Sequence, residues 1–166
     1  MDSEKQVEAS HYNFEDYVTW ERWQSYYTQL RFVLRQKPKS VLVVGAGDGL
    51  VANMLKSLGI NVKTVDVDPE LNPDYCVSIL EMSKIIREKF DLVLCCQVLE
   101  HLPFESFEIC LKELKNLSLK RVILSLPYRS FRPLNMVVKL PRVNPWFFSL
   151  SIPIWFKNFR FDGEHY

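Results

Sequence analysis

The chain has no run of 18 or more consecutive apolar residues, so the sequence predicts no transmembrane helix. Its first ten residues, MDSEKQVEAS, are polar and acidic, whereas a secretory signal is first basic and then apolar. We therefore expect a cytoplasmic protein.

A surplus of charge is also missing, since 21 basic residues face 20 acidic ones and the formal net charge is +1. This balance gives no global reason to expect nucleic acid as a partner. The four cysteines, Cys76, Cys95, Cys96 and Cys110, lack the CxxC spacing of a zinc site and the framework of a secreted domain. We expect them to be reduced core residues.

With 166 residues and 48% hydrophobic content, the chain is long enough to enclose one core without disulfides or a structural metal. We expect a single domain over residues 1–166. Within it we distinguish an N-terminal helical cap (1–39), a central core (40–128) and a basic, aromatic segment (129–166).

Apolar periodicity predicts a first helix that runs from an Asn13 cap, with Asp16 in the capping-box position, to about Gln36. Its expected apolar positions are Trp20, Trp23, Tyr27, Leu30 and Leu34. Aromatic side chains at helical spacing usually cover a core, so a core face is the first interpretation of this stripe.

Short apolar runs then predict strands at residues 40–44, 62–66, 76–79, 91–96 and 121–126. Helices are expected near Val51–Leu58, ending at a left-handed Gly59, at Met82–Glu88, and on the apolar positions Phe104, Phe107, Leu111 and Leu114. Strands that alternate with helices give a doubly wound α/β fold, with a mainly parallel sheet and helices on both faces.

Glycine is scarce, yet three of the five glycines fall in VLVVGAGDGL, directly after the strand at 40–44. Glycine permits positive φ and lets the backbone approach a ligand, and the following helix N-terminus offers N–H donors. Asp66 ends the next strand, 21 residues after Gly45, close to the interval at which an acid accepts hydrogen bonds from ribose. The pair indicates a nucleoside-containing cofactor.

Four motifs follow one another in order and spacing: VLVVGAGDG, TVDVDP, FDLVLCCQVLEHLP and RVILSLP. Together they resemble the motifs of class I S-adenosylmethionine-dependent methyltransferases over about Ser40–Tyr128. The resemblance implies a Rossmann-like methyltransferase fold, S-adenosyl-L-methionine as cofactor and S-adenosyl-L-homocysteine as product. It makes residues 40–128 the cofactor-binding core.

The resemblance also assigns roles to positions of this chain. Gly45, Ala46, Gly47 and Gly49 match the turn that receives the methionine part of the cofactor. Asp66 matches the ribose acceptor, with Val67 beside the adenine, and Ser78 and Ile79 match the place where the adenine edge is bound. Cys96 and Gln97 correspond to the position that faces the reactive end of the cofactor.

Gln97 stands where many relatives carry a glutamate that can help to bind magnesium. We therefore expect no metal site and interpret Glu100 and His101 as a local structural pair. Methyl transfer needs no dedicated base, because alignment and exclusion of water lower most of the barrier. For an acceptor that must lose a proton, His101 is the first candidate and Tyr128 the second.

Family members normally continue past the fifth strand with a helix and an antiparallel strand pair, whereas 38 residues follow Tyr128 here. We therefore expect a sheet that lacks its last two strands, with the strand at 121–126 as an open edge. From Arg129 to Arg160 there are six basic residues, no acidic ones, four prolines and many aromatics. A cap over the active site, a lipid-binding surface and a nucleic-acid contact remain open, and a mobile lid over a small, apolar or lipid-like substrate is our hypothesis.

Two other functions stay open at this stage. A methyltransferase-like module could bind cofactor or partner without turnover. A nicotinamide-dependent oxidoreductase shares the glycine turn and the acid, although Leu50 occupies the place of the last glycine of a GxGxxG fingerprint.

Tyr12, Tyr17 and Trp20 are placed to close over a cofactor, as helices before the first strand do in the resembled family.

Overall fold

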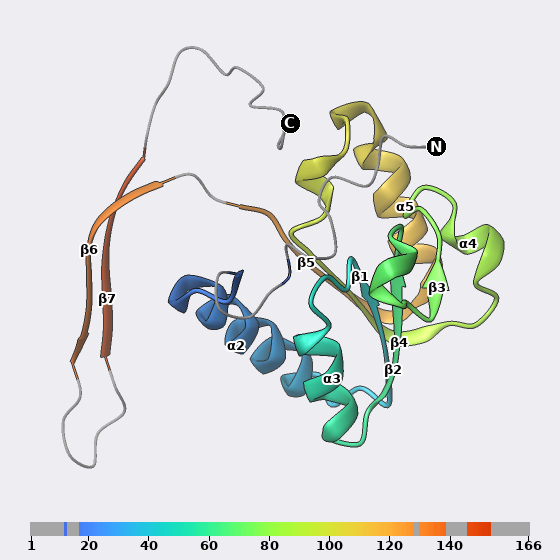
Figure 1. The fold of residues 1–166 in the computed structure, drawn as a ribbon, viewed down its shortest axis with the longest axis horizontal. Coiled ribbons are helices and arrows are strands. Elements are labelled where there is room, and N and C mark those ends of the chain that lie inside the picture. Colours follow the sequence, from blue (N-terminus) through green and yellow to red (C-terminus); the bar gives the residue numbers. More distant parts are fainter. Residues whose placement is uncertain (1–11, 13–16, 128–129, 139–145, 154–166) are drawn as a thin grey trace. The chain divides into compact units, whose positions relative to one another are not determined.

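The computed structural model describes residues 12, 17–127, 130–138 and 146–153. They fall into two compact units that divide at Pro127, and each is described by itself (Figure 1). Within the described ranges, no helix combines the length and the apolar character needed to cross a membrane.

The first unit is built on a five-stranded parallel sheet. Its strands are β1 (Ser40–Val44), β2 (Asn61–Asp66), β3 (Tyr75–Cys76), β4 (Phe90–Cys96) and β5 (Ser118–Ser125). Their spatial order is β3-β2-β1-β4-β5, so the chain starts in the middle of the sheet and winds toward both edges. This order confirms the predicted doubly wound, Rossmann-like fold.

Helices cover both faces of this sheet (Figure 1). The α-helices are α2 (Trp20–Arg35), α3 (Leu50–Ser57), α4 (Met82–Ile85) and α5 (Phe107–Leu117), and the 3₁₀-helices are η2 (Pro69–Leu71), η3 (Leu99–His101) and η4 (Phe104–Ser106). Two apolar clusters show the division, because α2 and α3 contribute to one and α4 and α5 to the other.

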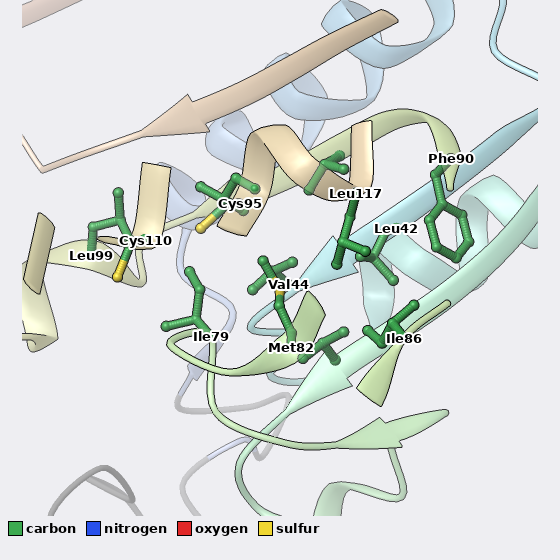
Figure 2. Packing of buried hydrophobic residues seen from close by; sticks show 13 residues of the cluster. Leu42, Val44, Ile79, Met82, Ile86, Phe90, Cys95, Leu99, Cys110 and Leu117 are labelled. Carbon is green, nitrogen blue, oxygen red and sulfur yellow. The ribbon is translucent and has the colours of Figure 1, made fainter. Parts of the chain in front are cut away.

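Strand β1 explains why both faces can be apolar. Alternate residues of a strand point to opposite faces, so Leu42 and Val44 join the α4/α5 cluster while Val41 and Val43 join the α2/α3 cluster. Figure 2 shows the first cluster, in which Phe90 and Met82 are fully buried. A continuous apolar run is what a strand covered on both sides requires.

The start and the buried face of the first helix differ from expectation. Helix α2 begins at Trp20, and Thr19 is its cap, with a side chain that accepts the Arg22 N–H at 3.3 Å. Val18 and Thr19 are not helical, so the predicted continuous helix from residue 13 is wrong, and the expected cap residues 13 and 16 lie outside the described ranges.

The buried residues of α2 are Tyr26, Leu30 and Val33. Of the predicted positions, Trp20, Trp23, Tyr27 and Leu34 are exposed. The predicted face was therefore rotated, and only Leu30 belongs to both sets. Aromatic residues occur on either side of the true face, so spacing alone did not choose between them.

Three other elements differ in length. Strand β3 has two residues instead of the expected four, α4 ends at Ile85 instead of Glu88, and β5 begins at Ser118, three residues early. Phe104 does not belong to the buried face of α5, because it lies in η4 after Pro103 and is 81% exposed.

The second unit is an antiparallel pair, β6 (Ser130–Val138) and β7 (Trp146–Pro153). Its register runs from Val138 opposite Trp146 to Ser130 opposite Pro153, with an irregularity between Phe131 and Leu134. In the described part of the chain the main sheet has five strands. That the basic, aromatic segment forms strands of its own was not predicted.

Candidate cofactor site

The glycine turn lies between β1 and α3, at the edge of the sheet where the parallel strands end. Gly45, Gly47 and Gly49 all have positive φ, at 71°, 52° and 71°, a region that residues with a Cβ enter only with strain. The Gly45 N–H donates to the Val65 carbonyl at 2.8 Å, which fixes the turn to the neighbouring strand β2.

Gly45 is also packed too closely to carry a side chain. A Cβ at this position would lie 2.2 Å from Cγ2 of Val98, which follows the end of β4 by two residues. Val98 packs against the α4/α5 cluster. The turn is therefore held between β2 on one side and the loop after β4 on the other.

Asp66, at the last position of β2, reaches the same turn. Its Oδ2 accepts a hydrogen bond from the Gly47 N–H at 3.4 Å, and its Oδ1 accepts one from the Asp68 N–H at 3.1 Å. The two features that the sequence placed 21 residues apart thus converge in space. The long contact to Gly47 leaves acceptor capacity on the carboxylate, since each oxygen has two lone pairs.

Asp48 links the turn to helix α2. Its Oδ1 accepts the Leu50 N–H at 3.0 Å, at the start of α3, and its Oδ2 accepts the hydroxyl of the buried Tyr26. Sequence reasoning did not single out Asp48. The signal was available, because an aspartate two residues before a helical N–H commonly accepts from it.

Tyr12, which precedes α2, lies at the turn, and Tyr17 packs against it. The Tyr12 ring would be 3.3 Å from a Cβ on Gly47, and it meets Tyr17 edge-on with ring centroids 4.9 Å apart. Arg22 stacks over the Tyr17 ring at 3.7 Å and donates to its hydroxyl at 2.6 Å. Burial, together with Tyr17 and Asp66, raises the pKa of Tyr12 to about 12, so its hydroxyl is neutral at physiological pH.

A cavity of about 460 Å³ opens beside the turn. Its walls include Tyr12, Gly47, Asn53 of α3 and Leu71 of η2. Trp20, the third aromatic residue expected near a cofactor, is 65% exposed. The glycine turn therefore borders open space that Tyr12, α3 and η2 also line.

With this geometry established, residues 42–122 match a family model described as a methyltransferase domain. Over these 81 of its 166 residues the chain is similar to the methyltransferase domain family. The match covers the glycine turn, Asp66, the end of β4 and most of β5. It also disfavours the nicotinamide-dependent alternative. No curated protein sequence matches the chain.

Solved structures agree on the fold. The N-methyltransferase NodS from Bradyrhizobium japonicum WM9, in complex with S-adenosyl-L-homocysteine, has 16% identity and a TM-score of 0.56 over 62% of this chain and 60% of NodS. The magnesium protoporphyrin IX methyltransferase ChlM from Synechocystis PCC 6803, with bound S-adenosylmethionine, has 15% identity and a TM-score of 0.53 over 79% of each chain. The chain thus spans about 60% of the length of NodS.

The three residues expected to lie at the adenine differ in which of their atoms a ligand could contact. The Ile79 side chain is buried in the α4/α5 cluster, as Figure 2 shows, so only its backbone is available to a ligand. The Ser78 hydroxyl accepts the Leu80 N–H at 3.1 Å. Val67 is half-buried, and its carbonyl accepts from the Cys76 thiol at 3.5 Å.

Cys96 and Gln97 lie where β4 ends, as predicted, and Ser125 of β5 holds both. The Gln97 N–H donates to the Ser125 carbonyl at 3.1 Å, and its side-chain amide donates to the Ser125 hydroxyl at 3.3 Å. Burial raises the pKa of the Cys96 thiol, and hydrogen bonds with Ser125 offset part of the rise. Ser125 was missed, although a polar residue at the end of a parallel strand marks this edge.

Of the two candidate bases, the structure describes only His101. His101 ends η3 and is half-buried, one residue after Glu100. Tyr128 lies outside the described ranges. Among the residues that the structure describes, no group of three or more His, Cys, Asp or Glu side chains is arranged to hold a metal ion.

Proposed function

We propose that this protein binds S-adenosyl-L-methionine at the glycine turn and transfers its methyl group to a small, apolar or lipid-like acceptor. The observation that carries the proposal is the 3.4 Å contact between the Gly47 N–H and the Asp66 carboxylate, within the region that is similar to the methyltransferase domain family. This contact places the backbone N–H that would bind the amino-acid tail of the cofactor beside the carboxylate that would accept from its ribose.

The residues present fit the cofactor. Gly45, Ala46, Gly47 and Gly49 form a turn in which a Cβ on Gly45 would clash with Val98, and the N-terminus of α3 behind it offers N–H groups to a carboxylate. Asp66 accepts from the ribose hydroxyls. NodS and ChlM, which share the fold, were solved with S-adenosyl-L-homocysteine and S-adenosylmethionine.

The remaining positions orient the cofactor along the same edge. Val67 packs beside the adenine, while Ser78 and the Ile79 backbone bind its polar edge. Cys96 and Gln97, which Ser125 holds at the end of β4, face the reactive end. Asp66 thus holds the ribose in the middle of the cofactor, and the residues that Ser125 holds lie beside the neighbouring sulfonium.

The bound cofactor supplies an electrophilic methyl group on a sulfonium, and its product is S-adenosyl-L-homocysteine. The protein aligns the acceptor with this group and excludes water. Where the acceptor must lose a proton, His101 accepts it, and Tyr128 is the second candidate. No metal is assigned to the reaction.

The proposed acceptor class is supported by sequence. Residues 129–160 interleave basic residues with aromatic ones, a composition suited to an apolar molecule better than to a phosphate backbone. ChlM, one of the solved structures with this fold, is named for magnesium protoporphyrin IX, a small-molecule substrate.

A single-turnover experiment tests the proposal. The full 166-residue chain is mixed with methyl-labelled S-adenosyl-L-methionine and a panel of small apolar and lipid-like acceptors, and labelled product is separated. Enzyme-dependent label in one acceptor class supports methyl transfer. Cofactor binding without label in any acceptor would instead make the chain a binding module.

A further inference from the structure

We propose that Tyr26 and Asp48 form a positioning pair through which helix α2 sets the conformation of the cofactor turn. The inference rests on the proposed function, because it assigns these residues an effect on cofactor affinity. Neither residue needs to touch the cofactor. Tyr26 lies 22 positions before Asp48, so the pair joins the turn to a helix that is distant from it in the sequence.

Asp48 lies inside the turn, between Gly47 and Gly49. Both flanking residues have positive φ, and a glycine-flanked segment has many accessible conformations. One oxygen of Asp48 accepts the Leu50 N–H at 3.0 Å, which ties the turn to α3. The other accepts the Tyr26 hydroxyl, which ties it to α2.

Tyr26 is a rigid donor. Its side chain is 8% exposed and packs in the α2/α3 cluster with Leu30, Val51 and Leu55. Trp23 meets its ring edge-on, with centroids 6.5 Å apart. Burial and the hydrogen bond to Asp48 raise the pKa of the Tyr26 phenol, so it keeps its proton and donates over the whole physiological pH range.

Holding Asp48 has a consequence for its neighbours. The Gly47 N–H, whose contact with Asp66 is long at 3.4 Å, and the N–H groups that follow Leu50 in the first turn of α3 are the donors proposed for the amino-acid tail. Asp48 lies between them in the chain. When two separate elements fix Asp48, these donors are aligned before the cofactor arrives. Preorganisation of this kind raises affinity, because less conformational entropy is lost on binding.

The test compares Tyr26→Phe with Tyr27→Phe in the full chain. Both remove one hydroxyl from adjacent positions of α2, but Tyr27 is 62% exposed. Calorimetric titration with S-adenosyl-L-homocysteine should show about fivefold weaker binding for Tyr26→Phe, the value of one typical hydrogen bond. Tyr27→Phe should bind like the unsubstituted protein.

A merely structural role gives a different pattern. It would lower the melting temperature of Tyr26→Phe equally with and without S-adenosyl-L-homocysteine and leave its dissociation constant unchanged, which overturns the positioning role. If the unsubstituted chain does not bind S-adenosyl-L-homocysteine, the proposed function fails first. The two failures are therefore distinguishable.

A second pair of variants tests whether the effect of the Tyr26 hydroxyl depends on Asp48. Asp48→Ala removes every side-chain hydrogen-bonding group at position 48, so no hydrogen bond from the Tyr26 hydroxyl to this side chain remains. In that background, Tyr26→Phe should weaken binding less than it does in the unsubstituted chain. An equal loss in both backgrounds would show that the hydroxyl acts without Asp48 and would overturn the proposed pair.

Discussion

Replacing Gly45 by Ala should destabilise the folded protein through two separable effects at the glycine turn. The new Cβ lies 2.2 Å from Cγ2 of Val98, whereas carbon atoms pack at about 3.5 to 4.0 Å. Overpacking of this kind costs about 1 to 3 kcal/mol. The φ of 71° adds about 1 to 2 kcal/mol of left-handed strain. We expect a total loss of about 2 to 5 kcal/mol in the free energy of unfolding.

The structure supplies a control for each effect. Gly59 has a φ of 80°, and a Cβ on it would meet nothing within 4 Å, so Gly59→Ala should show the strain alone, about 1 to 2 kcal/mol. In a Val98→Ala background the clashing methyl is gone, and Gly45→Ala should cost no more than Gly59→Ala. β-Branched Val98 cannot rotate away cheaply in the unsubstituted chain.

Urea unfolding followed by far-ultraviolet circular dichroism measures these differences. The reasoning is refuted if Gly45→Ala costs the same with Val98 and with Ala at position 98. It is also refuted if Gly45→Ala and Gly59→Ala are equally destabilised with Val98 in place.

Three further predictions concern stability and substrate binding. Asp74, which accepts from the Thr64 N–H and hydroxyl at 3.0 Å and from Lys63 at 2.9 Å, should cost about 1 to 2 kcal/mol when changed to Asn. Despite the opposing effect of burial, these bonds lower its pKa, so the stability it adds is present above about pH 4 and is lost as pH falls, which acid titration of both proteins checks. The pKa of Tyr12 is about 12, so the folded chain keeps a proton that the unfolded chain loses; stability should fall between about pH 10 and 12, and less steeply in Tyr12→Phe. Deleting Phe131–Phe159 should abolish methyl transfer and leave S-adenosyl-L-homocysteine affinity nearly intact, whereas equal loss of both refutes a substrate lid.

The sheet was predictable because its signals are local. Strand β1 matches its expected range, because a short, continuous apolar run between Pro38 and Gly45 is typical of a buried strand. Gly59 is left-handed just after the C-cap of α3, as expected, because a residue without a Cβ adopts this conformation most easily. Asp66 and the glycine turn converge because parallel strands carry their carboxyl ends to one edge.

The buried face of α2 depends on contacts distant in sequence. Trp23, Tyr26 and Tyr27 are all aromatic and all compatible with a core, so periodicity allowed more than one face. The hydroxyl of Tyr26 finds Asp48, 22 residues away, and the ring fits against α3. No local pattern contains that information.

The antiparallel pair of β6 and β7 was not predicted, because the four prolines of this segment only argued against one continuous amphipathic helix. Pro153 ends β7, and Pro133 falls in the irregular part of β6, between Phe131 and Leu134. Proline is tolerated at strand ends and at bulges, where its missing N–H breaks no ladder hydrogen bond. The role of Val98 was equally hidden, since it meets Gly45 only in the folded chain.

Titration with S-adenosyl-L-homocysteine tests the central claim most directly. Calorimetry should show one-to-one binding to the unsubstituted chain and no binding of NAD. Asp66→Ala should lose about 1.5 to 3 kcal/mol of binding free energy, because the ribose loses its acceptor. Asp91→Asn is the control, since Asp91 accepts from Lys39 and Lys120 at the opposite, amino-terminal edge of the sheet. No binding to the unsubstituted chain, or equal affinity in the Asp66 and Asp91 variants, would contradict the account.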